Sequence, residues 1–259
     1  MRRARVAFGG AVHEAVVADD ARSLRLADGR TVAETEVVWL PPVQPRTIVA
    51  LGLNYADHSA ELGFKPPEEP LVFLKAPNAL VGHKAVTRRP ADANQMHYEC
   101  ELTVVIGATC RNVPRADAYS VVGGYTVAND YAIREYLENY YRPNLRVKNR
   151  DGCTPLGPWV TDAADVADPM KLALSTTVNG KVVQSGNTAD MVFDIPYLIE
   201  YLTAFMTLHP GDLILTGTPQ GVVYLNPGDV VVTEVEGVGR LQNTLVSDED
   251  YYAPRPGSL

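Results

Sequence analysis

Two glutamates separated by one residue lie in the segment HYECELTVVIG, residues 97–107. Alternate side chains of a β-strand share one face, so Glu99 and Glu101 would point the same way as His97. The opposite face would then carry the apolar side chains of Leu102, Val104 and Ile106. Neighbouring carboxylates on one face repel each other unless a cation neutralises them. The pattern fits two interpretations at this point: a pair of metal ligands, or the solvent face of an edge strand.

A third carboxylate follows another apolar segment. The stretch GGYTVAND, residues 123–130, reads as a strand ending in Asp130, where a turn could direct the side chain at the same space. Two Glu and one Asp make an all-oxygen site, which suits Mg²⁺, Mn²⁺ or Ca²⁺ better than zinc. The sequence has five histidines and no His-x-His pair, which argues against a histidine-rich site. Glu99, Glu101 and Asp130 are therefore the candidate metal ligands.

A histidine with a nearby acid lies in NYADHSAE, residues 54–61. If this segment forms a helical turn, His58 and Glu61 are i, i+3 neighbours with Cβ atoms about 5–6 Å apart. The glutamate could then orient the imidazole and raise its basicity, as a general base requires. The same pair is also common on ordinary surface turns, so the spacing alone leaves both interpretations open.

Two further segments could bind an anion. Lys148 and Asp151 precede an apolar segment, where they could fix an oxyanion or a carboxylate, or form an ordinary surface ion pair. The loop LTGTPQGV, residues 215–222, could present backbone N–H groups to a carboxylate, or it could be a plain turn.

The composition argues against several classes of function. The 259 residues carry a net charge of −8, so we expect no nucleic-acid partner. Three widely spaced cysteines indicate neither a disulfide framework nor a thiolate zinc site. No signal-peptide core and no apolar run of about 18 residues is visible, so we expect a cytoplasmic protein without a membrane partner. One basic cluster could attract an anionic substrate or be a solvated loop: Arg142, Arg146, Lys148 and Arg150.

The elements that must position these residues are mainly short strands. Residues 1–44 contain an Asp28-Gly29 turn and end at the proline-rich LPPVQP, which predicts a small N-terminal β domain followed by a catalytic domain over residues 45–259. A hairpin is expected around Asn179-Gly180. The expected strands of the larger domain lie in RTIVALGLNY, EPLVFLK, CELTVVIG, GGYTVAND, DLILTG, DVVVTEVEG and GRLQNTLV.

Helices are few. Apolar residues at helical spacing predict a helix over Ile195–Met206 with Asp194 as its cap, and Tyr131–Tyr141 is a second candidate. The strands do not alternate regularly with helices, so the sequence predicts a mainly β, α+β protein rather than a βαβ fold.

The ordered set of motifs resembles the fumarylacetoacetate hydrolase superfamily over residues 47–247. The set is Glu-x-Glu on a strand, a strand ending in Asp, Lys-x-x-Asp, and Gly217-Thr218-Pro219. The resemblance implies a mixed β-sandwich roll with the small N-terminal β appendage. It also implies that Glu99, Glu101 and Asp130 hold Mg²⁺ or Mn²⁺. The residues implied in catalysis are His58 and Glu61, on a lid, and Lys148; those implied in contacting or supporting the substrate are Arg134, Lys75, Asp151 and Thr218.

Three segments look like the C-terminal half of the bifunctional isomerase/decarboxylases of homoprotocatechuate (4-hydroxyphenylacetate) degradation: 51–78, 129–152 and 200–221. This implies a small anionic 2-oxo acid as substrate. The implied reactions are decarboxylation of 5-oxopent-3-ene-1,2,5-tricarboxylate, isomerisation of 2-hydroxyhepta-2,4-diene-1,7-dioate to 2-oxohept-3-enedioate, or both, through a dienolate held at the metal. A homodimer or a pair with a paralogous subunit is also implied.

Two alternatives remain open. Within enzymes, the chain could hydrolyse a C–C bond in an acylpyruvate or decarboxylate oxaloacetate, although Leu137 stands where some such relatives carry a polar residue. From another class, it could be a non-catalytic subunit that stabilises an active paralogue. The presence of the three acids and the histidine–glutamate pair argues against that role.

Overall fold

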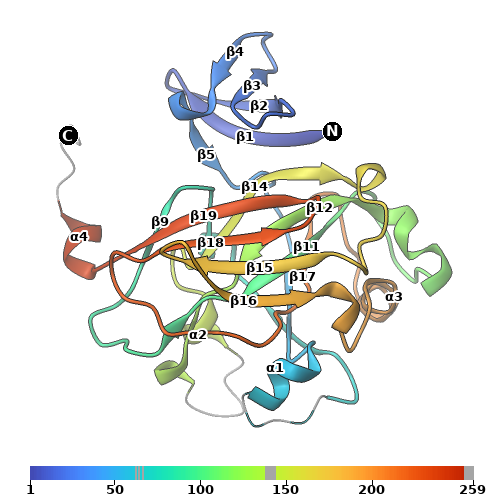
Figure 1. The fold of residues 1–259 in the computed structure, drawn as a ribbon. Helices are drawn as coiled ribbons and strands as arrows, with labels where there is room; N and C mark the ends of the chain where they lie inside the picture. Colours follow the sequence, from blue (N-terminus) through green and yellow to red (C-terminus); the bar gives the residue numbers. More distant parts are fainter. Residues whose placement is uncertain (62, 64, 66, 138–143, 254–259) are drawn as a thin grey trace.

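The computed structural model describes residues 1–61, 63, 65, 67–137 and 144–253 (Figure 1). Strands dominate this part of the chain and the helices are short, so the prediction of a mainly β protein with few helices is confirmed. The first strands are β1 (Arg2–Phe8), β2 (Ala11–Val17), β3 (Ser23–Leu26), β4 (Thr31–Ala33) and β5 (Val38–Leu40).

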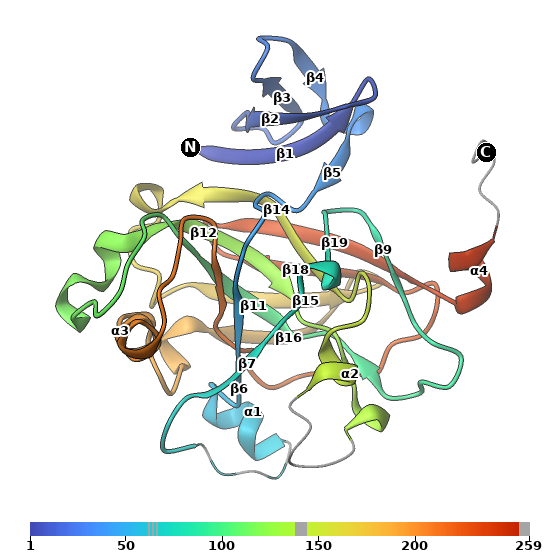
Figure 2. The same cartoon turned by 180° about the vertical axis from the view of Figure 1, so that it is seen from behind.

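These N-terminal strands form a unit that projects from one side of the molecule (Figures 1 and 2). The expected hairpin at Asp28-Gly29 joins β3 to β4. Trp39 and Trp159 pack into one cluster with the buried side chains of this unit. Since β1 pairs with β14 (Thr154–Asp162), the sheet continues across the proposed domain boundary, and the boundary at residue 44 itself stays a prediction.

From β1 the main sheet continues in the order β14-β12-β11-β17-β6-β7, and β8 pairs with β14. The strand β11 (Cys100–Ile106) is flanked by its neighbours β12 and β17, and every one of its residues is buried. The interpretation of Glu99 and Glu101 as the solvent face of an edge strand is therefore wrong. The other strands are β6 (Ile48–Gly52), β7 (Leu71–Leu74), β8 (Leu80–Val81), β12 (Val122–Asn129) and β17 (Leu213–Leu215).

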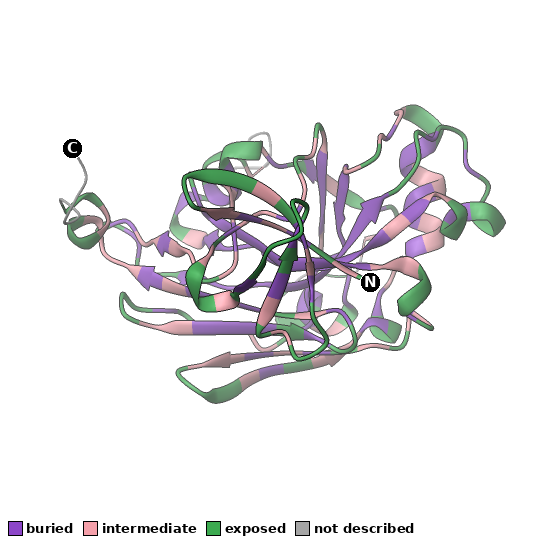
Figure 3. Ribbon diagram, turned by 90° about the horizontal axis from the view of Figure 1, so that it is seen from above, coloured by how far each residue is buried: buried purple, intermediate pink, exposed green. Residues whose placement is uncertain are grey.

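A second sheet covers one face of the first and has the order β16-β15-β18-β19-β9. Its strands are β9 (Val86–Arg88), β15 (Ala173–Val178), β16 (Lys181–Asn187), β18 (Val230–Val235) and β19 (Gly239–Val246). Leu102 and Val104 of the first sheet share a core cluster with Leu174 and Leu241 of the second. The hairpin at Asn179-Gly180 is confirmed, since both residues have positive φ, 51° and 80°. Seen from above, buried residues run through the strands at the centre of the molecule, whereas exposed residues lie on the N-terminal strands and on edge strands such as β16 (Figure 3).

The helices are α1 (Ala56–Glu61), α2 (Leu145–Lys148), α3 (Ile195–Phe205) and α4 (Asp248–Tyr252). The prediction of α3 and its Asp194 cap is confirmed. The helix expected over Tyr131–Tyr141 is wrong where the structure describes it. There β13 (Ala132–Ile133) pairs with β10 (Met96–His97), and a single 3₁₀ turn follows, because long-range pairing overrides the local helical preference. Residues 138–141 of that segment lie outside the described residues.

None of the helices in the described ranges is long and apolar enough to cross a membrane. The helices α1 and α2 lie at the end of the molecule opposite the N-terminal strands (Figures 1 and 2).

The cap of α3 gives a test of the fold. Asp194 Oδ1 accepts from the Tyr197 N–H at 2.9 Å, and its Oδ2 forms an ion pair with exposed Arg115. We expect D194A to lower the free energy of unfolding by about 1 kcal/mol, because the cap is lost. D194N should lose far less, since it keeps a capping oxygen and an exposed ion pair contributes little. Urea denaturation measures both, and equal losses would contradict a capping role.

Candidate active site

The pairing of β11 with β12 brings the three predicted metal ligands together. The strands are antiparallel with Cys100 opposite Asn129, so the start of β11 lies beside the end of β12. Glu99 and Glu101 flank Cys100, and Asp130 follows Asn129. Carboxylate oxygens from the three acids all lie within 4.8 Å of one another, and the three side chains are buried.

Two buried lysines compensate part of this negative charge. Lys75, directly after β7, places Nζ 2.6 Å from Asp130 Oδ1 and also donates to the carbonyl oxygen of Lys148. Lys148, at the end of α2, places its own Nζ 2.6 Å from Glu99 Oε2. Burial opposes the charge on Lys148, but Asp130 and Glu99 outweigh that effect and raise the pKa of Lys148. Lys148 is therefore a fixed cation at the site, and Lys75 adds a second ion pair on the side of Asp130.

Arg134 supplies a third cation and is oriented by a histidine. Its Nη2 donates to Glu99 Oε1 at 3.2 Å, and its Nε donates to His97 Nε2 at 2.8 Å. His97 Nδ1 lies 2.9 Å from the Tyr98 carbonyl oxygen, which can only accept, so Nδ1 carries the hydrogen. Burial above all, with Arg134 and Lys148 adding to it, lowers the pKa of His97 to about 4 despite Glu99. The neutral ring is thus an acceptor for Arg134.

Glu101 is the acid of this group that forms no ion pair within the described residues. Its Oε2 accepts from the Gly217 N–H at 2.7 Å, whereas its buried Oε1 has no hydrogen-bond partner. Asp130 Oδ2 also has no hydrogen bond, although Lys148 Nζ lies 2.9 Å away. Burial, followed by the charges of Asp130 and Glu99, raises the pKa of Glu101 well above its ordinary value. A cation between these oxygens would satisfy them.

The chemistry of the donors fits a divalent metal ion. All three candidate ligands are carboxylates, the donors that Mg²⁺ and Mn²⁺ prefer. Cys100 lies between two of them in the chain, but burial raises the pKa of its thiol to about 12, which disfavours a thiolate ligand.

The expected histidine–glutamate contact forms on α1. His58 Nδ1 lies 2.9 Å from Glu61 Oε2, and Glu61 Oε1 accepts from the Gly221 N–H at 3.0 Å. Burial alone would raise the pKa of Glu99, but neighbouring basic side chains, His58 among them, lower it to about 2. Through Glu61 and Gly221 this histidine–glutamate dyad is joined to the loop that contacts Glu101 at Gly217.

Thr218 is buried in the loop after β17, next to the Gly217 that contacts Glu101. Its Oγ1 accepts from Gln184 Nε2 at 2.9 Å. This loop therefore reaches the acidic group through Gly217 and α1 through Gly221.

The expected pair between Lys148 and Asp151 does not form. Lys148 is turned toward Glu99 and Asp130, whereas Asp151 is exposed and accepts from Asn78 Nδ2 at 2.6 Å. The implied support of substrate by Asp151 stays a prediction.

The basic cluster around Lys148 is divided. Arg146 and Arg150 lie over the ring of Tyr136, with Cζ 3.9 Å and 5.4 Å from its centroid, and Arg142 lies outside the described residues. Among the members that the structure describes, Lys148 is the one that contacts the acidic group.

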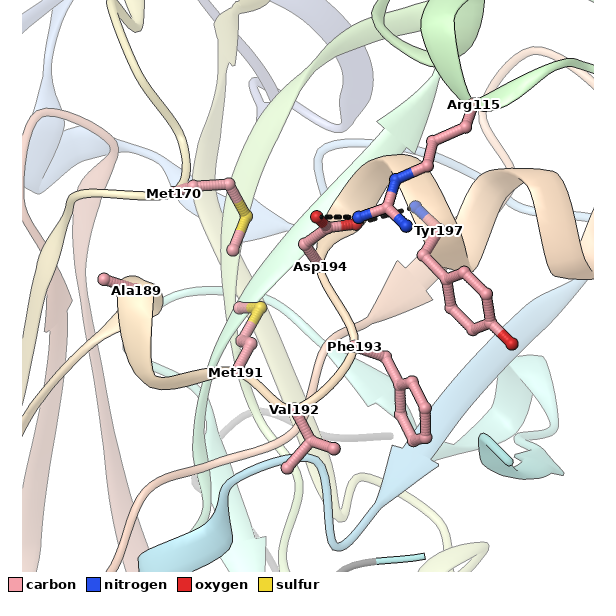
Figure 4. Close-up of a pocket in the computed structure, with 8 residues that line it drawn as sticks. All are labelled: Arg115, Met170, Ala189, Met191, Val192, Phe193, Asp194 and Tyr197. Atoms are coloured by element: carbon pink, nitrogen blue, oxygen red, sulfur yellow. Dashed lines mark hydrogen bonds and ion pairs between the residues drawn. The ribbon is translucent and has the colours of Figure 1, made fainter. Parts of the chain in front are cut away.

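A separate cavity of about 480 Å³ lies beside the start of α3. Figure 4 shows Met170 and Met191 turned toward the same space, with the Arg115–Asp194 ion pair and Tyr197 nearby. Its two charged side chains are paired with each other, and none of its lining residues was predicted as a site residue. The reactive groups thus gather at Glu99, Glu101 and Asp130 instead.

The sequence did not reveal the residues that hold the site in shape. Asn54 donates from Nδ2 to the carbonyl oxygens of Thr216 and Phe193, and Gln184 contacts Thr218. Both are buried polar side chains that directly follow short apolar runs, Leu-Gly-Leu before Asn54 and Val-Val before Gln184. That pattern is a usable signal, because a buried amide must find hydrogen-bond partners.

A sequence model of the family described as fumarylacetoacetate (FAA) hydrolase, C-terminal, matches residues 47–246. The chain belongs to the fumarylacetoacetate hydrolase family. It is 62% identical over 224 residues to the 4-hydroxyphenylacetate degradation bifunctional isomerase/decarboxylase of Escherichia coli. That match covers 86% of this chain and 52% of the relative, so the chain spans about half the length of such curated relatives.

Solved structures of the fumarylacetoacetate hydrolase fold agree with this assignment. A 2-hydroxyhepta-2,4-diene-1,7-dioate isomerase from Mycobacterium marinum superposes with a TM-score of 0.84 at 35% identity, covering 96% of this chain and 99% of that one. A maleylpyruvate hydrolase from Sphingobium sp. SYK-6, in complex with manganese (II) ion and pyruvate, superposes with a TM-score of 0.82 at 30% identity. That match covers 95% of this chain and 99% of the hydrolase chain. The predicted fold class is confirmed.

Glu101 provides a direct test of metal binding. We expect E101Q to weaken Mn²⁺ binding by roughly 100-fold or more, since an anionic ligand is lost. The amide oxygen can still accept from Gly217, so the fold should survive. Isothermal titration calorimetry and thermal unfolding measure the two effects. The exposed acid Glu234 is the matched control, and E234Q should bind Mn²⁺ like the wild type. Equal affinity in E101Q would remove Glu101 from the ligand set.

The raised pKa of Glu101 also predicts a pH dependence. Without a bound cation its carboxyl group keeps its proton to higher pH than an ordinary glutamate. The metal must displace that proton, so Mn²⁺ affinity should be weaker at about pH 6 than at about pH 8. Titrations in buffers of different ionisation enthalpy would detect the released proton. Affinity independent of pH, with no proton release, would contradict this.

Proposed function

We propose that this chain catalyses decarboxylation of 5-oxopent-3-ene-1,2,5-tricarboxylate and isomerisation of 2-hydroxyhepta-2,4-diene-1,7-dioate to 2-oxohept-3-enedioate. The observation that carries the proposal is Glu101, a buried carboxylate that forms no ion pair with the described residues, in a group of acids bordered by Lys75, Lys148 and Arg134. That arrangement suits a metal and an anionic substrate together. The activities for which the Escherichia coli relative and the Mycobacterium marinum isomerase are named support the choice of reactions.

A divalent ion held by Glu99, Glu101 and Asp130 would act as a Lewis acid toward the 2-oxo group and stabilise negative charge on its oxygen. Mg²⁺ is our proposed native ion, with Mn²⁺ as a substitute. Arg134 donates from Nε to His97 and from Nη2 to Glu99. Its Nη1 forms no hydrogen bond within the described residues. We assign Nη1 to a substrate carboxylate.

Both reactions pass through the same dienolate of the substrate. In decarboxylation the bond to the departing carboxyl group breaks, its electron pair moves through the alkene to the 2-oxo group, and CO₂ leaves. In isomerisation the C2 hydroxyl group loses its proton and a proton arrives at C5. One site that stabilises the dienolate therefore serves both reactions.

His58 is the residue that we assign to proton movement. Its Nδ1 is occupied by Glu61, so Nε2 is the atom left to take up or deliver a proton. Glu61 is held in turn by the Gly221 N–H, which fixes the orientation of the imidazole. Lys148 contributes a fixed positive charge beside Glu99 that favours the anionic intermediate. Lys75 would support Asp130 from the other side.

A partner chain is part of the proposal. We propose that the chain works as a homodimer or with a paralogous subunit, as its resemblance to the bifunctional isomerase/decarboxylases implies. Activity of the purified chain alone would rule out a purely non-catalytic role.

A second candidate is hydrolysis of a C–C bond in an acylpyruvate. The 30% identical maleylpyruvate hydrolase favours it, whereas half-exposed Leu137 offers no polar atom to position water. Incubation with the tricarboxylate and with maleylpyruvate separates the two candidates. Release of CO₂ supports decarboxylation, and release of pyruvate from maleylpyruvate alone would overturn it.

His58 gives the test of the proposed mechanism. We expect H58A to lower kcat by about 10²- to 10⁴-fold on both substrates, because general acid–base catalysis is lost. Mn²⁺ affinity should stay within about twofold, since His58 is not a proposed ligand. The matched control is H13A, in the distant strand β2, which should keep wild-type turnover. An unchanged kcat in H58A would remove the dyad from the mechanism.

A further inference from the structure

The strand β16 forms the platform on which the loop of residues 216–221 lies. A Cβ atom added to Gly186 would come within 2.6 Å of Pro219 Cγ, and one added to Gly221 would come within 3.0 Å of the Val183 carbonyl oxygen. Between these two close approaches lies Gln184, a buried amide on an otherwise largely exposed edge strand. Its presence there needs a reason beyond packing, because burying an amide is unfavourable unless its groups are bonded.

The partners of Gln184 fix the orientation of its amide. Nε2 donates to the Pro219 carbonyl oxygen at 2.8 Å and to Thr218 Oγ1 at 2.9 Å, and Oε1 accepts from Thr176 Oγ1 at 2.8 Å. A carbonyl oxygen can only accept, so the atom facing Pro219 must be the NH₂ group. Its second hydrogen then points at Thr218, whose oxygen is the acceptor.

This orientation decides what the Thr218 hydroxyl group can do. A hydroxyl group has one hydrogen to give, and Thr218 Oγ1 already receives one from Gln184. Within the described residues, no acceptor forms a hydrogen bond with the Thr218 hydroxyl hydrogen. The residue is only 2% exposed, so bulk water does not readily supply one. The preceding residue, Gly217, donates to the candidate metal ligand Glu101. The free hydrogen thus belongs to a residue next to the metal site.

We infer that Gln184 is a positioning residue that makes Thr218 a dedicated hydrogen-bond donor to the carboxylate adjacent to the 2-oxo group of the substrate. This rests on the proposed function, in which that carboxylate lies beside the metal. A hydroxyl group free to rotate could act as acceptor or donor and would bind water or neutral groups equally well. Held by Gln184, it favours an anion, so a residue outside the contact shell sets the specificity for 2-oxo acids.

The test uses pyruvate, a minimal 2-oxo acid, as the probe of the Mn²⁺-loaded protein. Loss of one hydrogen bond to a charged group should weaken pyruvate binding roughly 10- to 100-fold in T218V. Q184M should give a loss of similar size while Mn²⁺ affinity is kept. The double variant should bind no more weakly than T218V, because Gln184 acts through Thr218. T218S, which keeps the donor, should bind more tightly than T218V.

Two further variants control for disturbance of the hairpin and for misfolding of Q184M. S185A changes the exposed opposite face of β16 and is the control for disturbance of the hairpin. If Q184M does not fold, Q184E keeps the shape but can no longer donate when ionised, and it should lose pyruvate affinity in the same way. In turnover, the Gln184 variants should raise KM more than they lower kcat.

Each outcome decides the inference. Wild-type pyruvate affinity in the Gln184 variants, or additive losses in the double variant, would overturn it and leave the proposed reactions intact. A wild type that binds Mn²⁺ but not pyruvate overturns the inference, and turnover of the two proposed substrates then decides the proposed function separately. The expected pyruvate affinities of the single and double variants, found in a chain that turns over neither proposed substrate, would support the inference and reject the proposed function.

Discussion

The structure depends on how three buried carboxylates are held at the junction of β11 and β12. Three acids within 4.8 Å of one another in a buried site repel strongly and lose their hydration. Positively charged side chains from segments far apart in sequence compensate this repulsion: Lys75 after β7, Lys148 at the end of α2, and Arg134 near β13. The compensation is incomplete at Glu101, where a bound metal ion could supply the missing positive charge.

The loop of residues 216–221 connects the His58–Glu61 pair to the three buried acids. Thr216 bonds to the Leu102 carbonyl oxygen in β11, which fixes the start of the loop beside the acids. Gly217 then donates to Glu101, and Gly221 donates to Glu61 on α1. Gly217 has φ +88°, and a Cβ there would lie 3.0 Å from Asn54 Cβ, so another residue would be strained and crowded. One short loop therefore sets the distance between the proposed metal ligands and the proposed base.

Sequence reasoning brought the three acids together and named Lys75, Arg134 and Lys148 by resemblance, but it did not predict that these cations pair with the acids. The alternation of Glu99 and Glu101 with apolar residues, and Asp130 at the end of the next strand, predict one shared space, because neighbouring antiparallel strands bring those ends together. The pairing of Lys148 with Glu99 rather than Asp151 could not be predicted, since it depends on where α2 docks on the sheet.

The helical segment predicted from Tyr131 failed for a related reason. Its described part pairs with β10 and carries Arg134 to the site, where that contact outweighs local propensity. Buried ion pairs such as Lys75–Asp130 do little for stability, and well-packed apolar residues would often serve as well or better. Chains depart from local and apolar rules mainly where a site requires it. The segments whose structure was hardest to predict from this sequence are therefore those that carry the buried charges of the candidate site.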